Sequence, residues 1–368
     1  MRDAESPTAR HGEYLRQRHF GALDGVRGIC ILAVLWHHAG TPRPWRILQR
    51  GFLGVDMFFV LSGFLIVTLL LRERRRSGHI SLRAFYMRRT LRIFPIYYGL
   101  LAFLALAYGL FKPATDSAGF FSLLPVYLLY VSNWSPLQAA NLGIAWSLAT
   151  EEQFYLLWPA VEKVLRPPYL YVLLLGLLLL NQAINFSLLD SVFAGIYGTE
   201  KAPELEILDA TFTPICLGVG LAHALHRERA FCWLFRLLGH RHTSLVLALL
   251  LLALVSGAPA DISTWPRLLI QLLMTALLAA LVLRENHSMR LLLTWRPISR
   301  TGEISYGMYL LHLWAFHVAR WVNEALGWVN PYGLFVTGTV ATVAVAEASF
   351  RFYEKPFLSL KKHFQRAP

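Results

Sequence analysis

The sequence predicts an all-α, polytopic membrane protein built as a bundle of ten transmembrane helices. Of its 368 residues, 56% are apolar and 15% are charged, and the mean hydropathy is +0.46. A soluble domain usually carries about 25% charged residues. The apolar stretches are Leu/Ala runs without β-strand alternation, which favours helices over a barrel. The composition excludes a disordered chain, a disulfide-rich scaffold and a collagen-like fibre.

The predicted spans are stretches long enough to cross the hydrocarbon core, which takes about 20 mostly apolar residues. Eleven stretches compete for this role: 23–40, 52–71, 93–111, 119–133, 143–162, 169–188, 209–226, 243–257, 265–284, 304–325 and 333–353.

Charge fixes the side on which each loop lies, because cytoplasmic loops carry an excess of Lys and Arg. The segment 72–92 holds eight Arg against one Glu, and segments 227–241 and 284–300 hold four Arg each. The loop 189–209 holds five acidic residues and one Lys, so we expect it outside. The net charge of +13, which in a soluble protein would suggest nucleic acid, is thereby explained by the membrane, and no nucleic-acid partner is expected.

With these sides fixed, the stretch 119–133 cannot cross, and we expect a re-entrant or interfacial element there. The remaining spans place both termini in the cytoplasm. Residues 1–22 carry mixed charge and lack the apolar region of a signal peptide, so they are predicted to be a cytoplasmic tail. Residues 23–357 form the predicted transmembrane domain, and 358–368 form a basic cytoplasmic tail. The protein is expected in the inner (cytoplasmic) membrane.

The first outer loop conflicts with this charge rule, since it carries Arg43, Arg46 and Arg50. Two interpretations are open. These side chains bind an anionic acceptor, or they lie at the lipid headgroups.

The first span contains ionisable residues, which are costly inside a bilayer and usually face a polar cavity. Arg27 and His38 project in nearly the same direction and lie about 16 Å apart along a helix. One groove would then present a phosphate-binding cation at the inner end and an acid/base group at the outer end. The adjacent His37 points elsewhere. Either histidine is equally compatible with a hydrogen-bonded interfacial residue.

Asp56 begins the second span at about the depth of His38. A carboxylate beside an imidazole fixes its tautomer and raises its basicity. The alternative is stabilisation of the helix N-terminus by the acidic side chain. Ser62 and Gly63 are expected to allow close helix packing rather than to carry chemistry.

Arg88, Arg89 and Arg92 cluster at the inner end of the third span. One interpretation is anchoring to anionic lipid headgroups. The other is a pocket for a phosphorylated cytoplasmic ligand, because guanidinium groups bind phosphate in a bidentate manner.

Two later spans also carry polar groups. Glu151 and Glu152 are adjacent, so at least one is expected to meet an Arg or a polar cavity. Tyr306 and His312 lie in the ninth span, where His312 is also compatible with a core histidine bonded to a neighbouring helix.

Six motifs in this order resemble the membrane-bound acyltransferase-3 family, from Leu23 to about Phe357. They are LDGVRG with His38 following, GVDMFFVLSGF, RRTLRIFP, WSLATEEQFYLLWP, ISYGMYLLH and FRFYEKPF. The resemblance implies ten spans and transfer of an acyl group, commonly acetyl from acetyl-CoA, to a hydroxyl of a carbohydrate or glycoconjugate. It also implies that Arg27 and His38 are the essential pair and that Arg88, Arg89 and Arg92 help to hold the donor. The chain is expected to be a stand-alone form, without a C-terminal hydrolase-like domain.

The expected donor is acetyl-CoA or another acyl-CoA, and no metal is expected. Cys30, Cys216 and Cys232 lie far apart and predict neither a disulfide framework nor a zinc site. His38 would accept the proton of the acceptor hydroxyl, oriented by Asp56 or by a Glu of the 151/152 pair. An acyl-histidine intermediate is the other chemical route.

The competing hypotheses are a proton-coupled transporter, which also needs intramembrane ionisable groups, and an acyltransferase that acts on a small secondary metabolite. The sequence shows no inverted repeat.

Overall fold

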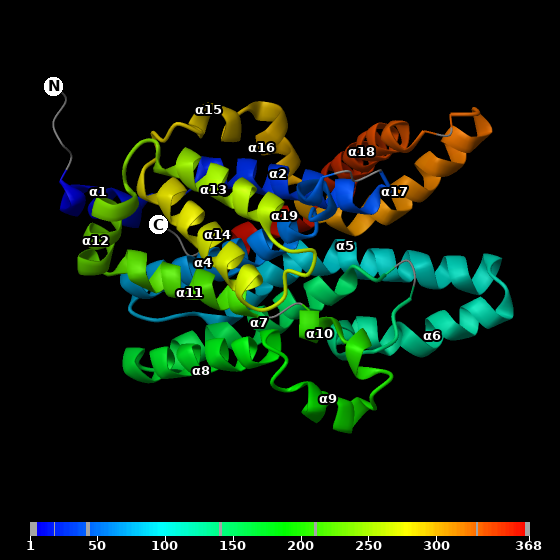
Figure 1. Cartoon of the computed structure of the whole chain (residues 1–368), viewed down its shortest axis with the longest axis horizontal. Helices are drawn as coiled ribbons and strands as arrows, with labels where there is room; N and C mark the ends of the chain where they lie inside the picture. The colour runs from blue at the N-terminus through cyan, green and yellow to red at the C-terminus, as the bar shows by residue number, and fades with distance from the viewer. Residues whose placement is uncertain are drawn as a thin grey trace. The chain divides into compact units, whose positions relative to one another are not determined.

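A computed structural model describes residues 6–17, 19–41, 45–139, 142–209, 212–328 and 330–364. Arg43 lies outside these ranges, as do residues 1–5 and 18 of the predicted N-terminal tail and the last four residues of the predicted basic tail. Within the described ranges all regular secondary structure is helical (Figure 1). The predicted all-α class is confirmed.

The chain divides into two compact units, each described here on its own. Unit 1 comprises residues 1–79, 165–182 and 212–305, and unit 2 comprises the remainder. The helices that lie wholly in unit 1 are α1 (Pro7–Arg16), α2 (Gly21–His38), α3 (Arg46–Gln49), α4 (Leu53–Ser77), α11 (Thr213–His226), α12 (Glu228–Leu238), α13 (Thr243–Gly257), α14 (Trp265–Leu283), α15 (Arg290–Leu293) and α16 (Arg296–Glu303). The helix α8 (Pro167–Asn185) contributes most of its length to the same unit.

The second unit contains the basic end of the third predicted span. Its elements are α5 (Leu82–Phe111), α6 (Ala114–Leu128), η1 (Ser132–Trp134), α7 (Ala145–Val164), α9 (Asp190–Tyr197), η2 (Ala202–Glu204), α10 (Glu206–Asp209), α17 (Ser305–Ala325), α18 (Pro331–Ala348), the π-helix η3 (Ser349–Glu354), α19 (Lys355–Ser359) and η4 (Leu360–Phe364).

Five of the described helices are long and apolar enough to cross a membrane, or up to seven if each of two bent pairs is one span. The chain is therefore a multi-pass membrane protein, and the count of ten stays a prediction. The helices α2, α7 and α17 are 18 to 21 residues long but carry the polar residues of interest. The polarity that makes them functionally interesting also lowers their hydropathy.

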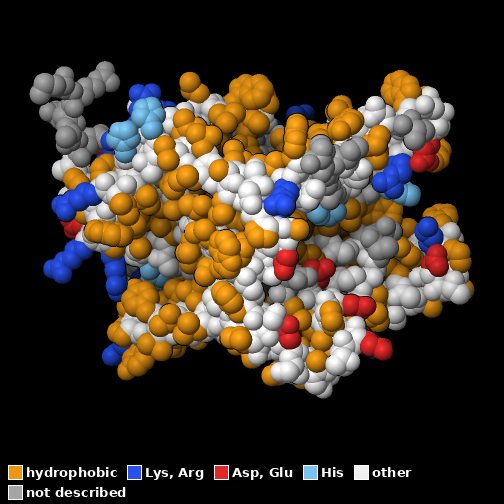
Figure 2. All heavy atoms as spheres, viewed as in Figure 1, with side chains coloured by type: hydrophobic (Ala, Val, Ile, Leu, Met, Phe, Trp, Pro, Cys, Tyr) orange, Lys and Arg blue, Asp and Glu red, His pale blue; other side chains and the backbone are white. Residues whose placement is uncertain are grey.

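Large apolar side chains remain exposed on the helices expected to face lipid, and Figure 2 shows wide hydrophobic areas on one face of the molecule. On α8, Val172 and Leu179 are exposed, and on α13, Leu249 and Leu250 are exposed. Contiguous apolar surface of this kind is unfavourable in water but suits contact with lipid tails.

The helices α4 and α11 form the centre of unit 1 and approach each other through glycines. A Cβ at Gly63 would overlap the backbone carbonyl oxygen of Ile215, and one at Gly218 would overlap that of Val60. Small residues at a helix interface let backbones approach closely in membranes. The close packing expected at Ser62 and Gly63 is thus made at Gly63, and Ser62 lies half-buried beside it.

The short helix α16 packs on the first half of α2 in the same way (Figure 1). A Cβ at Gly28 would overlap the carbonyl oxygen of Ile298, and one at Gly302 would overlap that of Asp24. Gly25 meets the backbone of Leu293 in α15. The polar end of α2 is thus held by backbone contact.

Replacing Gly302 by alanine is expected to destabilise unit 1 by about 3 kcal/mol, the upper end of the range for overpacking. The added methyl group would meet backbone atoms of Asp24, including the carbonyl carbon at 2.6 Å, and these cannot rotate away. Thermal unfolding of the purified protein in detergent measures the effect. Gly176→Ala is the matched control, since nothing lies within 4 Å of a Cβ there. Equal melting temperatures for the two variants would contradict the packing described.

Two arginines of the predicted first outer loop, Arg46 and Arg50, bind the end of a helix. Arg50 donates to the carbonyls of Val255, Ala258 (3.1 Å) and Pro259, and Arg46 donates to Ala258 at 2.9 Å. The last carbonyls of a helix carry partial negative charge and lack partners within the helix. Arg50 is 5% exposed. Arg46 and Arg50 thus cap the C-terminus of α13, and the two interpretations of this loop stay predictions.

His287, in the loop between α14 and α15, is 3% exposed, and neither ring nitrogen has a hydrogen-bond partner among the described residues. Burial, with a smaller contribution from Arg290, lowers the pKa of His287 to about 4. Because the folded protein prefers the neutral ring, its contribution to stability is present above about pH 6.5 and is lost as the pH falls from there towards about 4.

We therefore expect the wild-type protein to lose about 2 kcal/mol of stability from this residue between about pH 7 and about pH 5. His287→Leu should lose less over the same interval, because it has no group to protonate. Unfolding curves at the two pH values test this, with His242→Leu as the control for an exposed histidine. The same pH dependence in both variants would refute the expectation.

In unit 2, the helix α6 packs against the second half of α5 (Figure 1). Phe120 stacks on Tyr108 at 4.4 Å between ring centroids, and the Tyr97 hydroxyl donates to the carbonyl of Tyr127 at 2.9 Å. With 15 residues, α6 is shorter than a spanning helix needs. The predicted element at 119–133 thus corresponds to the end of α6 and the turn η1.

Candidate active site

His38 lies near the end of α2, and its hydrogen bond assigns its tautomer. Nδ1 is 3.0 Å from the carbonyl oxygen of Val34, one turn earlier in the helix. A carbonyl only accepts, so Nδ1 carries the proton and donates, and the lone pair of the neutral ring is on Nε2. In this tautomer Nε2 carries the lone pair that a general base uses.

His37 contacts His38 edge-on, with ring centroids 5.1 Å apart. Its Nδ1 donates to the carbonyl of Gln49 at 3.2 Å, and its ring also meets Phe52 at 5.4 Å. His37 thus ties the end of α2 to the loop before α4 and packs against the imidazole of His38.

Arg27 forms an ion pair within its own helix. Its Nη1 lies 3.0 Å from Oδ1 of Asp24, and Oδ2 of Asp24 lies 2.9 Å from Nε2 of His19. Asp24 and His19 were not among the sequence candidates. The i, i+3 spacing of Asp24 and Arg27 was the available clue.

The side of α2 between Arg27 and His38 is packed. Ile31 and Val34 lie on the same stripe between the two, and both are fully buried. The expectation of one groove along this stripe is therefore wrong, because apolar side chains fill it. The shared direction of Arg27 and His38 follows from helix geometry alone.

Asp56, on α4, has partners that the sequence did not suggest. Its carboxylate accepts two hydrogen bonds from Arg267 of α14, at 2.7 and 2.8 Å, and one from Gln271 at 3.0 Å. The residue is 1% exposed. Within the described residues these bonds pair Asp56 with a guanidinium and not with the imidazole of His38.

The arginine cluster of α5 lies in unit 2. Arg88 donates to the carbonyl of Phe364 in η4 at 2.9 Å. Arg89 lies 4.8 Å from the ring centroid of Tyr155 and interacts electrostatically with Glu151 and Glu152. Arg89 is thus a charged neighbour of the acidic pair, and the role of Glu151 and Glu152 stays a prediction.

The C-terminal segment adds a fourth cation to this cluster. Lys361 interacts electrostatically with Arg88, Arg89 and Arg92, and Glu354 interacts with Arg92 and Lys361. The sequence counted Lys361 only among the inner basic residues. Its approach to α5 depends on the turn of the chain through η3 and α19.

Tyr306 and His312 are packed inside unit 2. The Tyr306 hydroxyl donates weakly to the carbonyl of Ile93 at 3.5 Å. His312 is fully buried, and its Nδ1 donates to the carbonyl of Tyr309 at 2.7 Å. The Tyr309 hydroxyl in turn lies 2.7 Å from Oγ of Ser147 on α7. These contacts are those of a hydrogen-bonded core.

The candidates therefore form two groups. His37, His38, Arg27, Asp56 and Ser62 belong to unit 1. The members in unit 2 are Arg88, Arg89, Arg92, Glu151, Glu152, Tyr306 and His312. Over the described part of the chain, no group of three or more His, Cys, Asp or Glu side chains is arranged to hold a metal ion.

Comparison with known proteins identifies the family. The family model of the acyltransferase domain, acyltransferase-3, matches residues 20–348. The chain belongs to the acyltransferase-3 family. This match covers the described ion pairs of α2 and α4 and the arginine cluster of α5.

Curated relatives of this acyltransferase-3 chain include peptidoglycan O-acetyltransferase OatA of Listeria monocytogenes, 28% identical over 92% of this chain. Putative peptidoglycan O-acetyltransferase YrhL of Bacillus subtilis is 29% identical over 92%, and a putative O-acetyltransferase of Staphylococcus aureus is 28% identical over 94%. The chain spans between 55% and 58% of the length of these relatives. No solved structure matches.

Proposed function

We propose that this protein is an integral-membrane O-acyltransferase. It moves an acyl group, most simply acetyl, from cytoplasmic acyl-CoA to a hydroxyl of a cell-envelope carbohydrate at the outer side of the inner membrane. Peptidoglycan is the acceptor in the names of two relatives and is the first candidate here. Both termini lie in the cytoplasm in this proposal, in keeping with the basic inner segments.

The observation that carries the proposal is the tautomer of His38 within an acyltransferase-3 chain. With Nδ1–H held by the Val34 carbonyl, Nε2 accepts the proton of the acceptor hydroxyl. The alkoxide oxygen forms the new ester bond as the thioester C–S bond breaks. The imidazolium then returns the proton to the departing thiolate of CoA, so the histidine is neutral again.

The arginine cluster supplies the donor site in this proposal. CoA carries several phosphate charges, and guanidinium groups bind phosphate through charge-assisted, bidentate hydrogen bonds. Arg88, Arg89 and Arg92 lie together within the first three turns of α5, at the end of the basic segment 72–92. A site at this end keeps the charged part of CoA out of the hydrocarbon.

The proposal is tested by incubating the purified full chain with radiolabelled acetyl-CoA and soluble peptidoglycan fragments. We expect label in the fragments and acceptor-dependent release of free CoA, with mild base removing the label as expected for an O-acetyl ester. Release of CoA without labelled product would indicate hydrolysis only. Failure to release CoA with any carbohydrate acceptor would contradict the proposal and favour a transporter.

The donor site gives a separate prediction. Replacing Arg88 and Arg89 together by glutamine is expected to weaken binding of CoA about 100-fold, since each lost hydrogen bond between charged groups is worth about 1.5 kcal/mol or more. Isothermal titration of CoA at low and high salt measures this, and the wild-type protein should show the steeper salt dependence. Arg83→Gln, an exposed residue of the same helix, is the control. Unchanged affinity in the double variant would place the donor elsewhere.

A further inference from the structure

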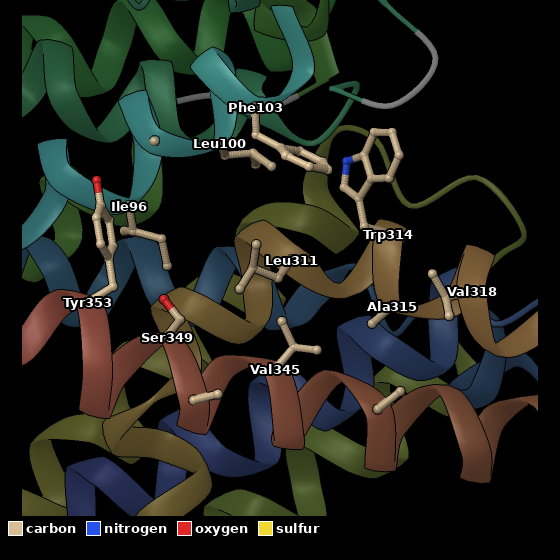
Figure 3. A pocket seen from close by; sticks show the side chains of 13 residues that line it. Ile96, Leu100, Phe103, Leu311, Trp314, Ala315, Val318, Val345, Ser349 and Tyr353 are labelled. Atoms are coloured by element: carbon tan, nitrogen blue, oxygen red, sulfur yellow. The ribbon is translucent and has the colours of Figure 1, made fainter. Parts of the chain in front are cut away.

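Unit 2 contains a cavity of about 690 Å³ between α5, α17 and the α18–η3 segment (Figure 3). Its walls include Leu100 and Phe103 of α5, Leu311 and Trp314 of α17, and Val345 of α18, as Figure 3 shows. None of the candidate catalytic residues lines it. The cavity is therefore a separate site from the candidate catalytic residues.

The side chains that line the cavity are mostly apolar and suit contact with a hydrocarbon chain. Apart from the indole nitrogen of Trp314, the polar side-chain atoms of the lining are the hydroxyls of Ser349 and Tyr353, at one end. The Ser349 hydroxyl donates to Glu354 at 3.1 Å, and the Tyr353 hydroxyl donates to the Pro95 carbonyl at 3.1 Å. The pantetheine arm of CoA carries two amides, which would lose their hydrogen bonds to water in such a cavity. A hydrocarbon chain forms no hydrogen bonds with water and therefore loses none on entering the cavity.

The cavity is open towards the surface that faces lipid. Five of its lining residues are exposed, among them Phe103 by 57%, Val318 by 54% and Val345 by 47%. Exposed apolar side chains on membrane helices lie against lipid tails. The surrounding bilayer is therefore a direct source of an occupant.

The polar end of the cavity continues into the cation cluster. Ile96, Leu100 and Phe103 line the cavity from one face of α5, and Arg92 lies one turn before Ile96 on that face, about 6 Å along the axis. On the other side, η3 contributes Tyr353 to the wall and the next residue, Glu354, to the cluster.

Charge at this end favours an anion. Arg92 and Lys361 both interact with Glu354 and with each other. Two cations thus face one carboxylate, and Arg88 and Arg89 add further positive charge. A phospholipid, in which a short glycerol unit joins the phosphate to the acyl chains, matches the short step from Arg92 to the apolar wall.

We propose that this cavity binds an anionic phospholipid of the membrane, with one acyl chain between α5, α17 and α18 and the phosphate at Arg92 and Lys361. This lipid is not the acyl donor and is not consumed in the proposed reaction, although its phosphate shares Arg92 with the proposed donor site. Its function is to occupy the gap between these three helices and to neutralise the inner end of the cluster.

The test uses the purified full chain in detergent with phosphatidylglycerol or phosphatidylcholine of the same chain length added, and native mass spectrometry of the retained lipid. We expect one phosphatidylglycerol to be retained per protein, with about tenfold preference over phosphatidylcholine, since two charge-assisted contacts separate the headgroups. Equal retention of the two lipids would overturn the assignment of the headgroup site.

Two pairs of neighbouring residues provide matched variants. Ala341 lines the cavity, whereas Val340 is exposed beside it and does not, so Ala341→Trp should abolish retention and Val340→Trp should not. Lys361→Gln should remove the preference for phosphatidylglycerol, and Lys362→Gln, at an exposed position, should leave it. Identical behaviour within either pair would overturn the proposal. Melting temperatures confirm that each variant is folded.

Discussion

Replacing His38 by alanine is expected to abolish acyl transfer, with a fall in turnover of about 10²- to 10⁴-fold, the usual contribution of a general base. The protein should still insert and bind CoA, because the hydrogen bond from Nδ1 to the Val34 carbonyl lies within α2 and holds no second helix. Turnover of labelled acetyl-CoA to peptidoglycan fragments measures the loss, and a melting curve shows whether the fold persists.

Asparagine at position 38 gives a sharper test than alanine. Its amide can reproduce the donation from Nδ1 to the Val34 carbonyl but supplies no base at the position of Nε2. We expect His38→Asn to be folded and as inactive as His38→Ala. His37→Ala, which removes the neighbouring ring, should keep substantial activity. A His38→Asn variant with turnover near wild type would exclude His38 as the base.

Breaking the ion pair of Asp56 and Arg267 is expected to cost about 3 to 5 kcal/mol of stability, because the remaining charge stays buried without its partner. Arg267→Leu leaves the carboxylate with Gln271 only, and Asp56→Asn leaves the guanidinium near the ring of Phe52, which lies 5.6 Å from it. Thermal or denaturant unfolding in detergent measures each loss.

The double variant separates a structural pair from a catalytic carboxylate. If the pair acts as a unit, Asp56→Asn combined with Arg267→Leu should be less destabilised than the sum of the single variants, by about 2 kcal/mol. Turnover per folded molecule should then change little. If Asp56→Asn instead stays stable but loses turnover like His38→Ala, Asp56 assists His38 and the structural role is wrong.

Local sequence patterns predicted the features that depend on one helix at a time. The all-helical membrane class followed from composition, because lipid requires the backbone to bond within each segment. The acidic pair Glu151 and Glu152 was expected to need a cation, since the cost of a buried charge is set by the charge itself. Arg89 interacts electrostatically with both acids, and their role stays a prediction. The close approach at Gly63 followed from the absence of a side chain.

The partners of buried polar groups were beyond the reach of sequence patterns. Asp56 and Arg267 are far apart in the chain, and nothing in either motif indicates that α4 and α14 are neighbours. The same holds for Arg50 and the end of α13, and for Lys361 beside α5. The buried apolar stripe between Arg27 and His38 was missed as well. Helix periodicity gives the direction in which a side chain points, but it does not show which side chains pack on that side of the helix.

The sequence by itself determined that this protein is a membrane helical bundle with an acyltransferase motif set, because hydropathy and motif order are properties of the chain read in one dimension. Only the tertiary structure decided which carboxylate pairs with which guanidinium, which nitrogen of His38 bears the proton and where an apolar cavity opens. The physical reason is that these depend on hydrogen bonds and packing between backbone and side-chain atoms whose positions are fixed only when the helices assemble.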